Sequence, residues 1–103
     1  MSEAPVSQRL DKWLWIARFF RTRSLSASVC EKGRVRVNRM VVEKAHYAVR
    51  PGDVLTFPQA DRIRVVRVTG IGPRRGSASD ARLLYEDLDA APEPAAGGAP
   101  DDG

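Results

Sequence analysis

The chain has 103 residues, of which 43% are hydrophobic and 29% charged, a balance typical of one soluble globular domain with a short tail. It contains one cysteine, one histidine and no run of about eighteen apolar residues. These counts argue against a membrane span, an internal disulfide and a metal site built from several such side chains. Because no secretory signal is evident at its start, we expect a cytoplasmic protein without membrane contact.

Charge is distributed unevenly along the chain. Residues 1–76 carry 16 basic and 6 acidic side chains, a net charge of +10, whereas residues 77–103 carry 1 basic and 7 acidic side chains, a net charge of −6. Of the 17 basic residues 14 are arginine, whose planar guanidinium binds phosphate through two parallel hydrogen bonds. The first part of the chain is therefore predicted to bind a polyanion.

The first predicted helix spans residues 8–20. Apolar side chains recur there at helical spacing and form one buried face, made of Leu10, Trp13, Leu14, Ala17 and Phe20. Trp15 and Phe19 form a second apolar strip beside it. Such a strip could stack on bases, but we expect it to pack, here against the C-terminal segment around Leu84 and Tyr85.

A second helix is predicted over residues 24–32. Thr22 or Ser24 is expected to act as its N-cap, because a hydroxyl can accept a hydrogen bond from the free N–H groups of the first turn. Gly33 follows where a left-handed C-cap belongs. The buried face is assigned to Leu25 and Val29, with Ala27 and Cys30 as further candidates.

The middle of the chain is predicted to be β-structure. Turns are expected at Asn38-Arg39-Met40 and at residues 50–53, and Pro58 is expected to end one strand. The last strand changes register midway, which indicates either a bulge or a strand with two apolar faces. The predicted strands are residues 34–38, 41–42, 54–57 and 62–69.

The C-terminal part divides into a basic loop, a short helix and an acidic tail. The loop is Arg74-Arg75-Gly76, and Ser79 is expected to cap a helix that continues to Leu88. From Asp89 the composition falls to Ala, Pro, Gly and acidic residues, which favours disorder. The predicted organisation is a flexible N-terminus (1–7), a core domain (8–72), a basic loop with a short helix packing on it (73–89) and a disordered acidic tail (90–103).

No catalytic or cofactor motif is recognisable in the sequence. It lacks a phosphate-binding glycine loop, a metal-binding histidine pair and a nucleophile elbow. Cys30 is interpreted as a small buried helix residue, and His46 as a loop or strand-edge residue. Among the carboxylates, Asp11 is expected to orient neighbouring arginines and Asp53 to belong to its turn. We therefore predict no enzyme activity, no cofactor and no metal.

The basic residues before Gly76 form two sets. The first set is predicted to make one polyanion-binding surface, helped by free N–H groups at the start of the second helix near Ser24. The second set is either a further polyanion contact or a device that protects an edge strand from aggregation. The first set is Arg9, Lys12, Arg18, Arg21, Arg23, Lys32, Arg34, Arg36 and Arg39, and the second is Arg62, Arg64, Arg67, Arg74 and Arg75.

Several short motifs occur in order along the chain: Arg9-Leu10-Asp11-Lys12-Trp13-Leu14, Arg18, Thr22-Arg23-Ser24, Gly33-Arg34-Val35-Arg36-Val37-Asn38 and Pro51-Gly52-Asp53-Val54-Leu55. Together they resemble the S4 RNA-binding domain. Within that superfamily the chain looks like the ribosome-associated heat-shock protein 15 family, because of residues 11–15 and the later segments 74–76 and 81–86. The resemblance covers roughly residues 8–89.

This resemblance implies an α+β fold, the S4-like (αL motif) domain, with two helices packed on a small, mostly antiparallel sheet. It also implies that the helix pair and the adjoining hairpin form the RNA surface, which reads RNA shape and phosphate positions. Many S4 modules turn the hairpin with Asn-Gly where this chain has Asn38-Arg39, and longer family members end in a basic extension where this sequence is acidic. The implied RNA-binding residues are Arg9, Asp11, Lys12, Arg18, Thr22, Arg23, Ser24, Lys32, Arg34, Val37 and Asn38, to which the charge pattern adds Arg36 and Arg39.

The predicted function is that of a non-catalytic protein that binds structured ribosomal RNA on the large ribosomal subunit and helps stalled translation to recover. Transfer RNA is a further candidate partner, no small-molecule substrate is expected, and the protein is expected to be a monomer. Two alternatives remain open: an RNA-targeting accessory subunit of an RNA-modification enzyme, and a DNA-binding helix-turn-helix regulator.

Overall fold

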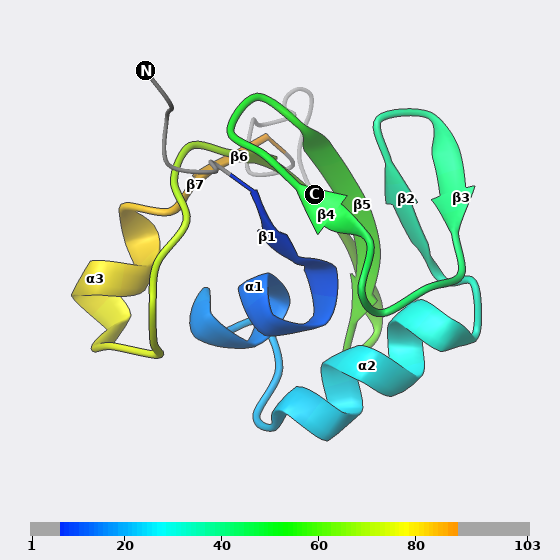
Figure 1. The fold of residues 1–103 in the computed structure, drawn as a ribbon, viewed down its shortest axis with the longest axis horizontal. Coiled ribbons are helices and arrows are strands. Elements are labelled where there is room, and N and C mark those ends of the chain that lie inside the picture. The colour runs from blue at the N-terminus through cyan, green and yellow to red at the C-terminus, as the bar shows by residue number, and fades with distance from the viewer. Residues whose placement is uncertain (1–6, 89–103) are drawn as a thin grey trace, which may run out of the picture.

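The computed structural model describes residues 7–88, so the predictions for the chain before Ser7 and for the acidic tail lie outside the described residues. Helices α1 and α2 lie on one side of a five-stranded antiparallel sheet, and α3 lies beside α1 (Figure 1). This is the predicted α+β class. No helix within residues 7–88 is long and apolar enough to cross a membrane. The elements are β1 (Gln8–Arg9), α1 (Leu10–Ile16), α2 (Arg23–Glu31), β2 (Val35–Val37), β3 (Met40–Val42), β4 (Ala48–Val49), β5 (Val54–Gln59), β6 (Arg62–Val68), α3 (Ala78–Arg82) and β7 (Tyr85–Asp87).

Helix α1 ends earlier than its apolar pattern predicts. After seven helical residues, Arg18 takes a left-handed conformation with φ of 67°. The N–H of Phe19 bonds to the carbonyl of Leu14 at 3.1 Å, and the N–H of Arg18 to that of Trp15 at 2.9 Å, which are the two bonds of a Schellman C-cap. The predicted end of this helix is therefore wrong, because an arginine occupies the cap position where glycine is usual.

Helix α2 has caps of the kind that the sequence indicates. The Thr22 hydroxyl accepts a hydrogen bond from the N–H of Leu25 at 3.1 Å, and Gly33 follows the helix with φ of 72°. The predicted buried face is wrong in part. The Leu25 side chain is 50% exposed, and Ser26, which was not predicted to be inward, is fully buried, because the face that meets α1 carries small residues. Cys30 is fully buried, as expected.

The five-stranded sheet has the order β3-β2-β5-β6-β7. Strands β2 and β3 form a hairpin through a two-residue turn at Asn38-Arg39, with Asn38 at φ of 58°. Strand β5 continues through Pro58, which was expected to end it. Pairing of β5 with β2 ends at Thr56, so the missing N–H of the proline removes no bond from that ladder.

Strand β6 pairs regularly with both of its neighbours, so the change in its apolar pattern does not mark a bulge. Val66 and Val68 are fully buried against the helices. Ile63 has the opposite parity and is 60% exposed. Of the two predicted explanations, the strand with two apolar faces is confirmed.

The last described segment forms a helix followed by a strand, where one helix was predicted. Helix α3 begins after Ser77, which forms a capping box with Asp80, and Ser79 lies inside the helix. The segment then extends as β7 and pairs with β6, which outweighs the local helical spacing. Because β7 pairs with residues 66–68 of β6, the interpretation of Arg67 as protection of an edge strand is wrong.

The core lies between the helices and the sheet. Trp13 is fully buried, and its indole N–H donates to the carbonyl of Gly70 at 2.8 Å, which ties α1 to the segment leading to α3. The ring of Phe19 lies between those of Phe57 and Tyr85, with centroid distances of 5.0 and 4.6 Å. The predicted packing of Phe19 against the C-terminal segment is therefore confirmed.

Candidate nucleic-acid interface

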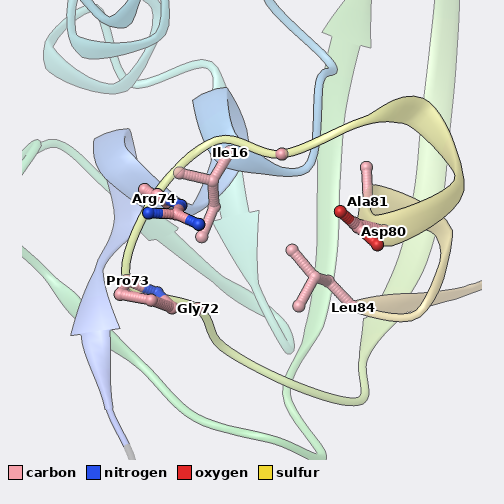
Figure 2. A pocket seen from close by; sticks show the side chains of 8 residues that line it. Ile16, Gly72, Pro73, Arg74, Asp80, Ala81 and Leu84 are labelled. Carbon is pink, nitrogen blue, oxygen red and sulfur yellow. The ribbon is translucent and has the colours of Figure 1, made fainter.

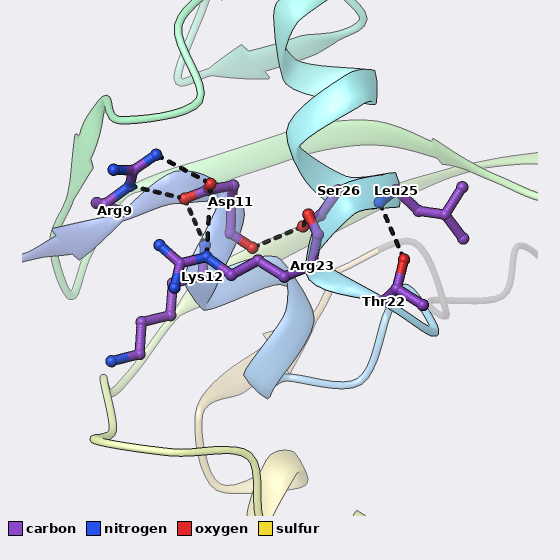
Figure 3. Close-up of polar contacts among 7 residues, drawn as sticks. All are labelled: Arg9, Asp11, Lys12, Thr22, Arg23, Leu25 and Ser26. Carbon is purple, nitrogen blue, oxygen red and sulfur yellow. Dashed lines mark hydrogen bonds and ion pairs between the residues drawn. The ribbon is translucent and has the colours of Figure 1, made fainter.

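Basic side chains surround one buried carboxylate where the starts of α1 and α2 meet (Figure 3). Arg9 donates from Nε and Nη2 to the two carboxylate oxygens of Asp11 at 3.0 and 3.1 Å. The Nε of Arg23 lies 3.6 Å from Asp11 Oδ2, and Lys12 follows Asp11 in α1. We refer to Arg9, Asp11, Lys12 and Arg23 as the α1–α2 basic cluster.

Asp11 holds the arginines of this cluster in place. Its side chain is 4% exposed, against 51% for Arg9 and 42% for Arg23. Its Oδ1 also accepts the N–H of Lys12 at 2.7 Å, in the first turn of α1, where the helix dipole favours negative charge. The prediction that Asp11 orients its neighbouring arginines is confirmed. The cluster thus presents three cations to solvent around one anion that faces inward.

The start of α2 adds backbone donors beside the cluster. The Thr22 hydroxyl accepts the N–H of Leu25, whereas the N–H groups of Arg23 and Ser24 have no partner within the helix. Free N–H groups and the positive end of the helix dipole both favour a phosphate. The exposed side of α2 at Ser24 is therefore suited to an anion that Arg23 can also reach.

A buried serine, which was not predicted from the sequence, joins the two helices at the cluster. The Ser26 hydroxyl lies 2.7 Å from the carbonyl oxygen of Asp11 and 2.8 Å from that of Arg23, and it can donate to either. It thereby fixes the backbone of two cluster residues relative to each other. Its i, i+4 spacing from Cys30 was the available signal, but a hydroxyl does not count as apolar in a hydropathy pattern.

Other residues of the predicted RNA surface lie apart from the cluster. Lys32 and Arg34 follow the opposite end of α2, and Arg39 is at the tip of the β2–β3 hairpin. Arg36 alternates with the two buried valines of β2, so it lies on the face of the sheet turned away from the helices. One of those valines is Val37, whose 2% exposure leaves no side-chain surface for RNA.

Asn38 serves the turn in which it lies. Its Oδ1 accepts the N–H of Val54 at 3.1 Å, and its Nδ2 donates to Asp53 Oδ1 at 3.3 Å. Asp53 Oδ2 also accepts the N–H of Arg50 at 3.0 Å, so the assignment of this carboxylate to its turn is confirmed. The side-chain amide of Asn38 therefore has protein partners on both its oxygen and its nitrogen.

Arg18 lies at the far end of α1 from the cluster. Its Nη1 donates to the carbonyl of Gly76 at 2.7 Å, next to α3. Arg75 is held nearby, since its Nε donates to the carbonyl of Trp15 at 3.2 Å and its guanidinium carbon lies 5.7 Å from the centre of that ring. Trp15 is partly buried beneath this contact. These bonds attach the basic loop to α1.

Two arginines of the second basic set pair with the acidic residues of β7. Arg64 Nη2 lies 2.9 Å from Asp87 Oδ2, and Arg67 Nη1 lies 2.7 Å from Glu86 Oε1. Arg67 and Glu86 are directly opposite on neighbouring strands. The acidic residues that follow α3 thus neutralise part of this set.

The described residues contain no group of three histidine, cysteine or acidic side chains placed to hold a metal ion. Cys30 is buried, and burial together with the nearby charge of Asp11 raises its pKa to about 12, so its thiol is neutral at pH 7. His46 is exposed in a loop, as expected. A largely apolar hollow of about 280 Å³ lies between α1 and α3 (Figure 2), and its charged lining residues are Arg74 and Asp80.

Replacing Asp11 by asparagine is expected to lower the free energy of unfolding by about 1–2 kcal/mol. The change removes the anion between two arginines, and the loss stays moderate because both arginines are about half exposed. Thermal unfolding followed by circular dichroism at pH 7 measures the effect, which corresponds to a fall in Tm of roughly 4–16 °C. The matched variant Asp61→Asn, at an exposed turn, should leave Tm unchanged, and an equal Tm for both variants would contradict the role of Asp11.

A protein family, a curated relative and a solved structure all match this chain. Residues 8–55 match the S4 domain family. The chain is 42% identical over 89 residues to the heat shock protein 15 homolog of Aeromonas salmonicida, covering 86% of this chain and 67% of that protein. The trimeric structure of Vibrio cholerae heat shock protein 15 is similar with a TM-score of 0.76 and 34% identity, covering 82% of this chain and 84% of that one.

A relative with another name also matches. The RQC P-site tRNA stabilizing factor of Halalkalibacterium halodurans is 36% identical over 78 residues, which is 76% of this chain and 86% of that protein. The chain spans about two thirds of the length of the curated heat shock protein 15 relatives that it matches.

Proposed function

Since this chain belongs to the heat shock protein 15 family, we propose that it binds structured RNA of the large ribosomal subunit and acts there on stalled translation complexes. The observation that carries the proposal is the α1–α2 basic cluster. Its cations are held by a buried carboxylate beside free backbone N–H groups, an arrangement suited to phosphate oxygens. The S4 match covers this cluster.

The name of one relative supports a partner made of structured RNA. One relative is named as a factor that stabilises P-site tRNA. A protein that holds such a tRNA must contact the ribosome or the tRNA itself, and both present structured RNA. We therefore keep ribosomal RNA as the first partner and tRNA as the second. The expected compartment is the cytoplasm, where ribosomes work.

The RNA-binding residues divide by their position in the structure. We propose Arg9, Lys12 and Arg23 as direct phosphate contacts, with Ser24 at the helix start. Asp11 acts by positioning two of these side chains. Peripheral contacts are proposed for the basic residues beyond α2, which are Lys32, Arg34 and Arg39.

A binding role without catalysis fits the chemistry of these residues. Cys30, a candidate nucleophile, is buried with a raised pKa. Within the described residues, the hollow shown in Figure 2 has one lining carboxylate, which forms the N-cap box of α3. General acid–base catalysis needs a titratable group that can reach a substrate, and the cluster offers cations and N–H groups instead.

Co-sedimentation with separated ribosomal subunits at stepped salt tests the proposed function. We expect pelleting with large subunits but not with small ones. If about five cations neutralise phosphates, affinity should fall by two to three powers of ten between about 50 and 200 mM salt. Equal pelleting with both subunits would contradict the choice of the large subunit and direct the search to tRNA or to a modification enzyme.

We also expect the protein to be a monomer, although the similar Vibrio cholerae structure is described as trimeric. The net charge of +10 on residues 1–76 opposes close packing of copies through this part of the chain. Light scattering coupled to size exclusion at about 150 mM salt should give a mass near 11.4 kDa. Three times this mass would show that the assembly named for the relative also forms here.

A further inference from the structure

A second group of arginines lines a pocket beside α3, at the end of α1 opposite to the basic cluster. The pocket has a volume of about 250 Å³, and three elements of the fold contribute its arginines: Arg18 after α1, Arg64 in β6 and Arg82 in α3. Phe19 and Tyr85 supply its aromatic lining. From the sequence, Arg18 was predicted to belong to the first basic set and Arg64 to the second, and Arg82 was assigned to neither.

The three arginines differ in how far their charge is neutralised. Arg64 is largely buried, with its side chain 13% exposed, and it pairs with Asp87 at 2.9 Å and bonds to Gln59 at 2.6 Å. Arg18 and Arg82 are exposed. Neither of these two forms an ion pair with another described residue. The pocket therefore keeps two positive charges next to one neutralised pair.

The backbone places Arg18 at the pocket. Its backbone φ of 67° is one that residues other than glycine rarely adopt, and the chain reverses direction there at the end of α1. Its Nη1 donates to the carbonyl of Gly76 at 2.7 Å, which anchors one edge of the guanidinium to the segment leading into α3. A guanidinium has five N–H donors, so the remaining donors are available to a ligand.

The aromatic lining makes the floor of the pocket rigid. Phe19 is 6% exposed and its ring centroid lies 4.6 Å from that of Tyr85, while the guanidinium carbon of Arg64 lies 5.3 Å from the Phe19 centroid. Tyr85 is partly exposed. Two arginines that line the pocket with these rings give it the positive charge that a phosphate group requires.

We infer that Arg18 and Arg82 bind a phosphate group of the RNA backbone, as a second contact separate from the α1–α2 basic cluster. This inference rests on the proposed RNA-binding function and deepens it. Helix α1 has seven residues and is thus about 10 Å long, so a single RNA can reach both of its ends. Phosphate contacts at both ends of one helix would fix the direction in which the RNA crosses the domain.

Nuclear magnetic resonance of the arginine Nε–H signals in the full chain tests the pocket directly. The probes are inorganic phosphate and a uridine tetranucleotide. We expect the Arg18 and Arg82 signals to move together and saturably with the tetranucleotide, and the shift at Arg18 to shrink several-fold in Arg82→Ala. Arg23→Glu should leave both shifts in place, because that residue belongs to the other cluster.

Large-subunit binding at stepped salt gives the second readout. Arg82→Ala should lower the slope of log affinity against log salt by about 0.7–0.9, the value for one lost phosphate contact. Arg18→Gly should do the same without lowering Tm, because glycine suits the left-handed position. Arg50→Ala, which removes an exposed arginine in a distant turn, should leave the slope unchanged.

The outcomes separate this inference from the proposed function. If the Arg23 signal moves with the tetranucleotide and those of Arg18 and Arg82 do not, the second contact is refuted while RNA binding stands. If only inorganic phosphate moves them, the pocket binds a free anion and the assignment to RNA is wrong. Failure of the wild-type chain to pellet with ribosomes refutes the proposed function, whereas saturable tetranucleotide shifts would still support the pocket.

Discussion

Replacing Arg23 by glutamate is expected to weaken binding to the large ribosomal subunit by about ten- to a hundredfold, or about 1.4–2.8 kcal/mol. The effect exceeds the loss of one contact because the new carboxylate lies beside the buried Asp11 and at the start of α2, where a phosphate is proposed to bind. Like charges placed together at an interface cost more than a missing contact. Co-sedimentation with large subunits at about 0.15 M salt measures the change.

Arg50→Glu is the matched control for this experiment. It makes the same change in net charge on an exposed arginine of the turn before β5, outside the α1–α2 basic cluster. It should reduce affinity only through the general field of the domain, by less than about threefold at 0.15 M salt. If both variants lose affinity by the same factor, binding depends on net charge alone and the α1–α2 basic cluster is not the binding site.

The features of the fold that could be predicted are those set by residues close together in the sequence. The caps of α2 were predictable because Thr22 and Gly33 act on neighbouring backbone groups. The end of α1 was not, since Arg18 stands at a left-handed cap position that sequence rules assign to glycine. Strand β7 was also missed, because its partner β6 is distant in the sequence and the residues themselves have helical spacing.

The sequence predicted which basic residues could belong to the candidate site better than it predicted where they lie in space. Arg9, Asp11, Lys12 and Arg23 are close in the sequence, and the short turn between the helices brings them together. Residues of the hairpin and the end of α2 carry the same charge, but strand alternation and turn bonding distribute them over different faces. Net charge in a sequence does not record the direction in which a side chain points, so one predicted surface became separate groups.

The C-terminal segment is part of the domain that carries the interface. Trp13 donates to the Gly70 carbonyl, and Arg75 donates to that of Trp15, so α1 is bonded to the chain on its way to α3. The strand β7 then pairs with β6. Since α1 also carries the basic cluster, damage to the packing of this segment should leave the cluster in place as long as the chain stays folded, and should otherwise affect only the second contact inferred at the pocket beside α3.

Replacing Phe19 by alanine tests that reasoning and is expected to lower the free energy of unfolding by about 3–5 kcal/mol. The ring is 6% exposed, and it packs against Phe57 and Tyr85 at centroid distances of 5.0 and 4.6 Å. Its removal leaves a cavity where the end of α1 meets β7, so Tm should fall by more than about 10 °C. Calorimetry of the purified chain measures this fall.

Binding measured well below the new Tm distinguishes packing from stacking on bases. If Phe19 packs, as the structure shows, the folded variant should lose no more affinity for large subunits than Arg82→Ala does, because the cluster on α1 and α2 is intact and only the lining of the pocket beside α3 is changed. An unchanged Tm with lost RNA binding would instead show that the ring stacks on a base. Leu83→Ala is the control for side-chain truncation, since Leu83 is 76% exposed and should change stability by less than about 0.5 kcal/mol.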